Sequence, residues 1–264
     1  MKYIIEMYDL VYSANNKIIL NNINLKIKQG EIVNVVSKNN SAKTTLLKLL
    51  GGYIITDNQV KIEGIKISNF NMEVINTKVS FITSNNEFFS KTVLEEILQD
   101  NVYVSLNEIN KVKKYLYDFN VPYLLNMSPL DLSYAENQIV SIIKFIIKNP
   151  KILLIDNAFN KFDIDKKTEL LKYLINYCKE NNITLIYSSN NLNDYLLFER
   201  IIILNKEKIF IDKSSDELFL DEKKLHQASL RLPFLRELND KLKMYDLIHD
   251  DYNNIDEMVD DLCK

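Results

Sequence analysis

Lys43, Thr44 and Thr45 end a polar loop that follows the mostly apolar residues 32–36 and precedes a leucine-rich segment. A strand, a loop and a helix in this order can bind phosphate, because backbone N–H groups at the helix N-terminus point at the anion. The lysine would pair with phosphate oxygens, and a threonine hydroxyl would ligate Mg²⁺. The same residues also suit an ordinary polar turn that begins a helix, so the segment alone leaves both interpretations open.

An aspartate at the end of a second apolar run is the other candidate for metal chemistry. Asp156 follows residues 152–155, which the apolar pattern predicts to be a buried strand. An amphipathic helix is predicted before this strand, beginning near Ser133 and ending at Asn149 and Pro150. The carboxylate of Asp156 could hold Mg²⁺ or could cap the next turn.

The order and spacing of these segments resemble the ATP-binding-cassette (ABC) family. Its members carry the phosphate-binding loop, a signature L-S-G-G-Q, a helix, a hydrophobic strand ending in D-E, and a loop ending in L-D; residues 132–138, 151–156 and 157–163 correspond to the later parts. The resemblance covers essentially the whole chain. It implies an α/β fold, an ABC-type P-loop nucleotide-binding domain with a mixed β-sheet, a helical subdomain and a small helical C-terminal extension, and ATP and Mg²⁺ as cofactors.

The resemblance also implies roles for individual residues. Tyr12 would stack on adenine, Ser133 would be the signature serine, and Thr44 and Asp156 would ligate Mg²⁺, Asp156 through water. The phosphates would be bound by the loop residues Asn39, Asn40, Ser41, Ala42, Lys43, Thr44 and Thr45. Tyr12 is one of fifteen tyrosines, so core packing is an open alternative for it. Ser133 would cap the following helix in either case.

The loop lacks the glycines that the family has at its first, fourth and sixth places. Ser37, Asn40 and Ala42 stand there instead, in a chain with only four glycines. Asparagine tolerates positive φ, but a methyl group at Ala42 would either strain the backbone by roughly 1–2 kcal/mol, if φ is positive there, or crowd the phosphate. We therefore expect Mg-ATP to bind weakly.

Three positions that the family uses in catalysis carry other residues. Asn157 replaces the glutamate that activates water, Asn190 replaces the switch histidine, and Ser84 replaces the glutamine that senses the γ-phosphate and couples to the membrane partner. A neutral amide cannot accept a proton, and loss of a general base costs ~10²–10⁴ in rate. The signature's two glycines and its glutamine are also replaced, by Tyr134, Ala135 and Glu136. We expect the chain to hydrolyse ATP poorly or not at all.

The hydrophobic pattern predicts the elements that position these residues. Up to residue 82 the chain reads mostly as strands and turns with one inserted helix, and residues 93–147 read as mostly helical. A helix over residues 166–179 separates two apolar strands, which predicts a βαβ unit with parallel strands. A hairpin is predicted around residues 205–207. We expect a nucleotide-binding domain over residues 1–212, with a helical subdomain at about 90–147, and an extension over residues 213–264.

Two amphipathic helices are predicted in the extension. Pro233 suits the first turn of a helix that carries leucines 235, 238 and 242 on one face. Asn254 can cap a last helix, with Glu257 placed to complete a capping box. The last helix has its apolar residues on one face: Ile255, Met258, Val259 and Leu262.

This extension narrows the resemblance within the family. Residues 230–235, Leu-Arg-Leu-Pro-Phe-Leu, and residues 254–259 resemble the C-terminal extension of energy-coupling-factor transporter ATPases. The resemblance implies that the extension helps two ATPase subunits to dimerise and that the pair drives a membrane coupling subunit. A generic helix pair packed on its own domain is the alternative.

Composition bounds the remaining possibilities. A net charge of −3 gives no indication of nucleic-acid binding or of a polybasic membrane patch. Cys178 and Cys263 fit no metal spacing and read as reduced thiols of a cytosolic protein. No signal peptide is expected at the start, and the apolar runs are too short to span a bilayer. If the protein works at a membrane, we expect it to dock peripherally on the cytoplasmic face.

The pattern as a whole leads to two hypotheses of function. In the first, the chain is the ATP-binding subunit of an energy-coupling-factor-type importer, catalytically impaired and paired as the degenerate half of a heterodimer. Its partners would be a second ABC ATPase with intact motifs and a membrane coupling subunit. In the alternative, it is a non-transport pseudo-ATPase with an interaction or regulatory role.

Overall fold

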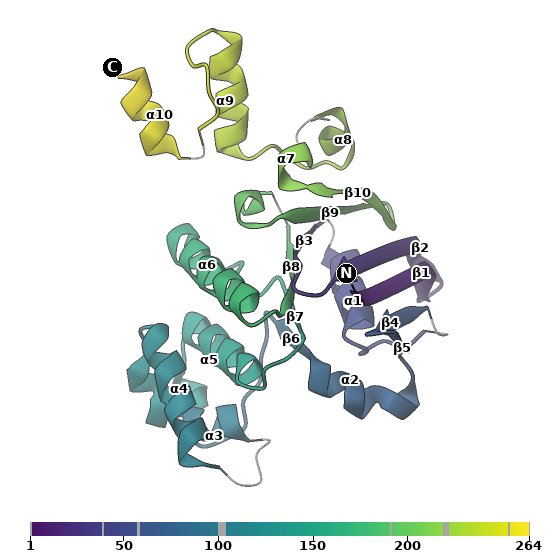
Figure 1. The fold of residues 1–264 in the computed structure, drawn as a ribbon, viewed down its shortest axis with the longest axis vertical. Helices are drawn as coiled ribbons and strands as arrows, with labels where there is room; N and C mark the ends of the chain where they lie inside the picture. Colours follow the sequence, from purple (N-terminus) through teal and green to yellow (C-terminus); the bar gives the residue numbers. More distant parts are fainter. Residues whose placement is uncertain are drawn as a thin grey trace.

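A six-stranded sheet with the order β10-β9-β3-β8-β7-β6 forms the centre of the molecule (Figure 1). Its strands are β3 (Ile32–Val36), β6 (Val79–Thr83), β7 (Ile152–Asp156), β8 (Thr184–Ser189), β9 (Arg200–Asn205) and β10 (Lys208–Ser214). Neighbouring strands run parallel except at the β9–β10 edge, which is the antiparallel hairpin predicted from the sequence. The computed structural model describes residues 2–38, 40–56, 59–99, 104–190, 192–218, 222–252 and 254–263.

The central strands are apolar throughout because both faces of the sheet are covered. Every residue of β3, β7 and β8 is buried, as in sheets that lie between two layers. Helix α6 (Ile164–Glu180) packs on one face and α1 (Asn40–Leu50) on the other. The predicted β7–α6–β8 unit is confirmed. This arrangement brings the carboxyl ends of β3, β7 and β8 to one edge, where parallel sheets place their ligand sites.

A second, antiparallel sheet has the order β2-β1-β4-β5. It comprises β1 (Tyr3–Ala14), β2 (Lys17–Lys28), β4 (Val60–Ile62) and β5 (Ile65–Lys66). Alternate residues of β2 are buried, as its polar–apolar alternation predicts. The buried residues of this sheet and those of α1 belong to one core cluster. A short 3-10 turn, η1 (Asn69–Asn71), and α2 (Met72–Lys78) lead on to β6.

A helical subdomain with its own core lies beside the central sheet (Figure 1). It contains α3 (Val93–Leu98), α4 (Leu106–Asp118), η2 (Pro122–Asn126), η3 (Pro129–Asp131) and α5 (Tyr134–Ile146). Helices α3, α4 and α5 each begin with a capping box, in which a Ser or Thr and a Glu three residues later satisfy each other's backbone N–H groups. Local sequence thus sets where each helix begins.

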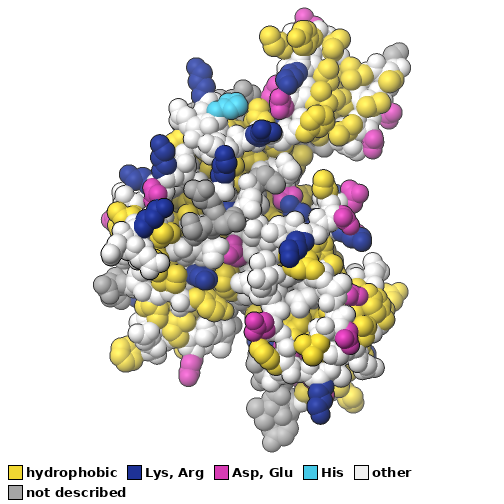
Figure 2. All heavy atoms as spheres, turned by 180° about the vertical axis from the view of Figure 1, so that it is seen from behind, with side chains coloured by type: hydrophobic (Ala, Val, Ile, Leu, Met, Phe, Trp, Pro, Cys, Tyr) yellow, Lys and Arg dark blue, Asp and Glu magenta, His cyan; other side chains and the backbone are white. Residues whose placement is uncertain are grey.

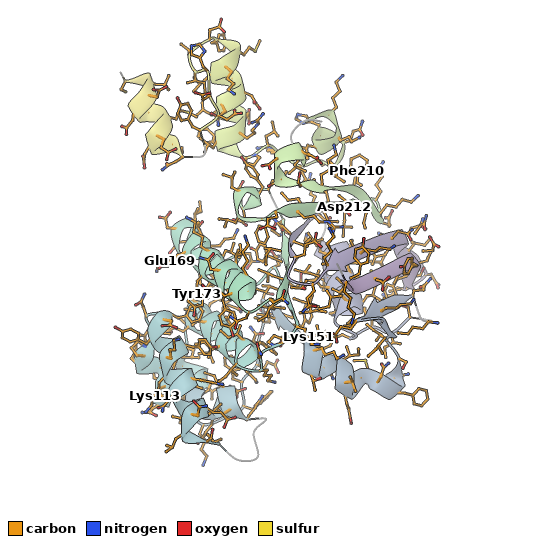
Figure 3. The ribbon with its side chains drawn as sticks, viewed as in Figure 1. Lys113, Lys151, Glu169, Tyr173, Phe210 and Asp212 are labelled. Carbon is orange, nitrogen blue, oxygen red and sulfur yellow. The ribbon has the colours of Figure 1, made fainter. Side chains whose placement is uncertain are left out.

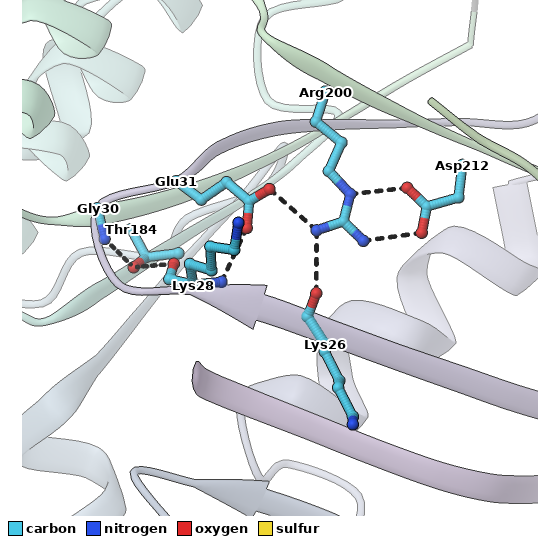
Figure 4. A network of polar contacts seen from close by, with 7 residues as sticks. All are labelled: Lys26, Lys28, Gly30, Glu31, Thr184, Arg200 and Asp212. Carbon is cyan, nitrogen blue, oxygen red and sulfur yellow. Dashed lines mark hydrogen bonds and ion pairs between the residues drawn. The ribbon is translucent and has the colours of Figure 1, made fainter. Parts of the chain in front are cut away.

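Arg200 connects the hairpin edge of the central sheet to the turn between β2 and β3 (Figure 4). Its guanidinium donates to both carboxylate oxygens of Asp212 at 2.7 Å. It also donates to Glu31 and to the carbonyl of Lys26, each at 2.9 Å. Gly30 has φ +75°, and an added Cβ would lie 2.6 Å from the side chain of Asn182, so the turn requires glycine.

The tail, residues 213–264, extends from the β9–β10 edge (Figure 1). It contains α7 (Ser215–Leu218), α8 (Glu222–Gln227), α9 (Phe234–Met244) and α10 (Ile255–Leu262). Residues of α7 and α8 are buried against β9 and β10. By contrast, α9 and α10 leave a broad hydrophobic area in solvent (Figure 2), including the exposed residues Phe234, Met244, Tyr245, Leu247, Ile255, Val259 and Leu262.

The helix starts in the tail differ in detail from those predicted. Pro233 is the N-cap of α9, one residue before the helix, rather than part of its first turn. Asn254 caps α10 by accepting from the N–H of Asp256, as predicted. Among the described residues, α10 has this side-chain cap alone and not the predicted capping box with Glu257.

Candidate nucleotide-binding site

The predicted phosphate-binding loop lies between β3 and α1, at the carboxyl edge of the central sheet. Asn39 lies outside the described residues, and Asn40 and Ser41 open α1. Ala42 is buried inside the first turn of the helix. Its backbone is therefore helical, and the strain that would follow from a positive φ does not arise. Crowding of a phosphate by its methyl group is the remaining effect.

Lys43 is buried and already bonded within the chain. Its Nζ donates to the carbonyl of Ser37 at 2.5 Å and to Oδ1 of Asn190 at 2.8 Å, and only 1% of the residue is exposed. Burial lowers the pKa of Lys43 from its ordinary value of 10.5 to about 8, while the charge of Asp156 partly opposes the shift. A phosphate would have to replace contacts that the lysine makes with its own loop and with Asn190, directly after β8.

Thr44 and Asp156 lie together, as the resemblance implies for a Mg²⁺ site. Thr44 donates to Oδ2 of Asp156 at 2.7 Å, and Ser188 donates to Oδ1 at 2.7 Å. These are the oxygen donors that Mg²⁺ accepts. In the described part of the chain no group of three or more His, Cys, Asp or Glu side chains could hold a metal ion. The site therefore fits a Mg²⁺ that keeps most of its ligands as water and phosphate oxygens. Thr45 follows on α1, half-buried.

The contact of Ser188 with Asp156 was not predicted, although the sequence contains a signal for it. The parallel register pairs Asp156 directly with Ser188. Adjacent parallel strands that both end in polar residues place those residues side by side, so the β7–β8 pairing could have indicated the contact.

Asn157 and Asn190 stand at the glutamate and histidine positions of the site. Asn157 follows β7 with φ +52°, a left-handed conformation that asparagine tolerates better than glutamate. Asn190 follows β8 and accepts the hydrogen bond from Lys43. The structure thus brings Asn190 to the lysine. Neither side chain can act as a proton acceptor at this site.

Ser84 contributes its backbone to a contact between the sheet and the helical subdomain. Its carbonyl accepts from Nε2 of Gln138 at 3.0 Å, and Oε1 of Gln138 accepts from Asn86 at 3.2 Å. Gln138 on α5 is fully buried. Its role was not predicted, although a glutamine between the apolar positions of an amphipathic helix is a signal for a buried polar contact.

Ser133 caps α5, and its polar groups are engaged by Glu136. The Ser133 N–H donates to Glu136 Oε2 at 2.8 Å, and the Glu136 N–H donates to Ser133 Oγ at 3.4 Å. Tyr123 donates to Oε1 of the same carboxylate at 2.7 Å. The Ser133 hydroxyl, followed by that of Tyr123, lowers the pKa of Glu136, so the carboxylate is ionised at neutral pH. A negative charge therefore stands beside the signature serine.

Tyr134, at the first signature glycine, bridges the helical subdomain and the loop after β7. Its hydroxyl donates to the carbonyl of Ala158 at 2.7 Å. The ammonium of Lys161 lies 4.8 Å from the centre of its ring, and the ring of Phe162 lies 6.1 Å away, edge-on. A glycine could make none of these contacts.

Tyr12 lies half-buried on β1 opposite Leu20 and packs against the core cluster that includes α1. A cavity beside the loop is lined by residues that include Ile18, Ser37 and Ala42, but not Tyr12. Its volume is about 60 Å³, far below the roughly 300–1,000 Å³ of small-molecule pockets. The structure thus does not bring Tyr12 into this cavity.

Three comparisons relate this chain to known proteins. A family model described as ABC transporter matches residues 20–160. The energy-coupling factor transporter ATP-binding protein EcfA1 of Oenococcus oeni is 30% identical over 99% of this chain and 98% of its own length. A putative ABC transporter ATP-binding protein of Methanocaldococcus jannaschii is 31% identical over 92% of this chain and 90% of its own length.

A solved structure confirms the fold that the resemblance implied. CbiO1 of Clostridium perfringens, described as part of the ABC transporter complex CbiONQ, superposes with a TM-score of 0.75. It covers 90% of this chain and 99% of its own, at 21% identity.

Proposed function

This chain belongs to the ABC transporter family, and on that premise we propose that it is the ATP-binding subunit of an energy-coupling-factor-type importer with an impaired site of its own. The names of the relatives support the transporter assignment. The impairment rests on one observation above the others. Lys43, the residue that would bind the phosphates, is bonded to Asn190, which stands where the family has a histidine.

The chain keeps part of the machinery that binds Mg-ATP. Lys43 would pair with phosphate oxygens after leaving Asn190 and the carbonyl of Ser37. Thr44 and Asp156 would hold Mg²⁺, which would supply positive charge to the bound phosphates. Asn157 can position a water molecule by hydrogen bonding but cannot take its proton. The expected result is weak binding without effective hydrolysis.

The signature segment supports the role of degenerate half in a heterodimer. In the family each composite site combines the P-loop of one chain with the signature of the other. Here the carboxylate of Glu136 holds Ser133, and the ring of Tyr134 lies where a glycine would leave the backbone open. A homodimer would therefore combine two defective halves in each site. A partner ATPase with intact P-loop, glutamate and histidine would supply what this chain lacks.

The tail supports assembly with that partner. We divide the chain into a nucleotide-binding domain over residues 1–212, with its helical subdomain at about 90–147, and a dimerisation extension over residues 213–264. The exposed apolar residues of α9 and α10 (Figure 2) suit an interface with another subunit. Burying such a side chain contributes roughly 1.5–3 kcal/mol.

A membrane coupling subunit is the other proposed partner, on the cytoplasmic face of the membrane. None of the helices that the structure describes is long and apolar enough to cross a bilayer. Phe89 follows the Ser84 segment, which in the family couples to the membrane partner, and 84% of this residue is exposed. An exposed aromatic ring at this position suits a contact with another protein.

Purification from the native host tests this proposal. We expect the tagged chain to bring along a second ABC ATPase and a membrane subunit, and Phe234→Asp to weaken this assembly by orders of magnitude. Tyr117→Asp, which places the same charge at a similarly exposed aromatic on α4, is the control. Recovery of neither subunit with the unmodified chain would contradict the proposal. If Phe234→Asp leaves the complex intact and lowers the melting temperature of the isolated chain, the tail packs on its own domain.

The non-transport alternative is favoured by the contacts that Ser133 and Tyr134 make within the chain, which leave the signature half of the ATP machinery closed. It predicts soluble protein partners and no membrane subunit in the same purification.

A further inference from the structure

A cavity of about 510 Å³ lies between the helical subdomain and α6. The end of α4, η2 and the first turn of α5 form one side, and the N-terminal half of α6 forms the other. Glu169 and Tyr173 project from α6 towards the helical subdomain (Figure 3). The volume falls within the range of sites that bind small molecules, roughly 300–1,000 Å³.

Aromatic side chains form much of the wall of this α4–α6 cavity. Phe119 and Tyr173 lie with their ring centres 4.5 Å apart. Tyr123 and Phe162 line it as well. These rings come from both sides, so a bound molecule would touch the helical subdomain and the core at once.

The charge of the lining is predominantly negative. Asp118, Glu136 and Glu169 contribute carboxylates. Lys166 is the sole basic residue among the described residues that line the cavity, and its ammonium lies 3.8 Å from the carboxylate of Asp163 outside the lining. Glu136 accepts from neutral donors, which are the hydroxyl of Tyr123 and the hydroxyl and backbone N–H of Ser133. Excess negative charge therefore faces the cavity.

We propose that the α4–α6 cavity binds an organic cation with an aromatic or apolar body. Ring faces attract a cation through their quadrupoles, and the carboxylates add direct attraction. The same charges disfavour phosphate compounds, so the expected ligand differs in charge from a nucleotide, although signature residues Ser133 and Glu136 belong to the lining. Because Glu136 belongs to the lining and also holds Ser133, a bound cation would fix the start of α5 relative to α6.

A pair of probes that differ mainly in charge tests the proposal on the full chain without nucleotide. Phenyltrimethylammonium is the cation, and N,N-dimethylaniline at pH 7.5 is its neutral counterpart; ligand-detected NMR titration gives both affinities. We expect the cation to bind at least about tenfold more tightly, and Glu169→Gln to weaken it by about fivefold while leaving the neutral compound unchanged. Glu180→Gln, the same change on α6 outside the cavity, is the control.

Three results would overturn the proposal. They are no binding of the cation, equal binding of the two probes, and an equal effect of the two glutamine variants, which would indicate only general attraction to an acidic protein. The measurement involves neither ATP nor a partner subunit. Its failure would therefore leave the proposed transport function untouched, and failure of that function would leave this site standing.

Discussion

The phosphate-binding loop and the signature segment have both lost the family's glycines, but their remaining polar groups are held in different ways. In the loop, Lys43 and Thr44 contact Asn190 and Asp156, which belong to the same site. Ligands could replace these contacts without separating any elements. In the signature, Ser133 is bonded within the first turn of α5, and Tyr134 reaches across to Ala158. Exposing the signature segment to a ligand would require α5 to move. The loop is weakened, whereas the signature has become part of the chain's internal structure.

The largest expected effect is on Mg-ATP binding by the loop, and it comes from substitution of Lys43. We expect the unmodified chain to bind Mg-ATP with Kd near ~1 mM. Lys43→Ala should abolish binding, a loss of at least about tenfold for a charge-assisted contact, and Ala42→Gly should improve it. Lys38→Ala, which removes an exposed charge from the same loop, is the control. Calorimetry that finds an affinity indifferent to Lys43→Ala and Ala42→Gly would mean that the loop is vestigial.

The second effect is a dependence of the free energy of unfolding on pH, which arises from Lys43 in the phosphate-binding loop. The pKa of Lys43 is about 8 in the fold and 10.5 ordinarily. Between these values the unfolded chain binds more protons, so the free energy of unfolding should rise with pH, by on the order of 1–3 kcal/mol. Below about pH 8 the full cost of burying the charge is present. Mg-ATP affinity should fall over the same range because the ammonium is lost.

Denaturant titrations from pH 7 to 10.5 on the unmodified chain and on Lys43→Met isolate this contribution. Other groups titrate in both proteins, so only the difference between them matters. A difference that stays flat with pH would show that the buried ammonium is not perturbed.

Tyr134→Phe comes next and addresses the signature side. It removes the hydroxyl that donates to Ala158 and keeps the ring, so stability should fall by about 1 kcal/mol. Amide hydrogen exchange should speed up in α5 and in residues 158–162, with nucleotide affinity unchanged. Tyr117→Phe on the exposed face of α4 is the matched control. Equal exchange in the two variants would show that Tyr134 does not hold the subdomain.

The smallest effect is expected for Glu136→Gln. Glutamine also completes a capping box, so stability should change by less than about 0.5 kcal/mol. The variant removes the negative charge beside Ser133 and the rise in the pKa of the Tyr123 phenol that Glu136 causes. Spectrophotometric titration of the tyrosines, compared with Glu95→Gln in the capping box of α3, measures this change. Burial also raises the pKa of Tyr123, so a Tyr123 pKa that does not fall at all in Glu136→Gln would contradict the contact.

The sequence was informative wherever neighbouring residues determine the outcome. Buried strands, the β9–β10 hairpin and the start of α5 at Ser133 followed from periodicity and capping chemistry. The contact between Lys43 and Asn190 could not be predicted, because it joins residues 147 positions apart through the pairing of β3 with β8. The helical backbone of Ala42 depends on where α1 begins. Tyr134 was visible only as a lost glycine, and what its side chain contacts depends on the packing of α5 against the loop after β7.

Phosphate release by the purified chain tests the central claim most directly, with the double variant Asn157→Glu, Asn190→His as a measure of what the rest of the site can do. The left-handed φ of Asn157 means that the glutamate costs about 1 kcal/mol of strain, so any gain would come against that cost. We predict no ATP hydrolysis above background for the unmodified chain, because the site has no proton acceptor at Asn157 and its lysine is held by Asn190. Turnover by the unmodified chain alone at a rate typical of the family would contradict this account.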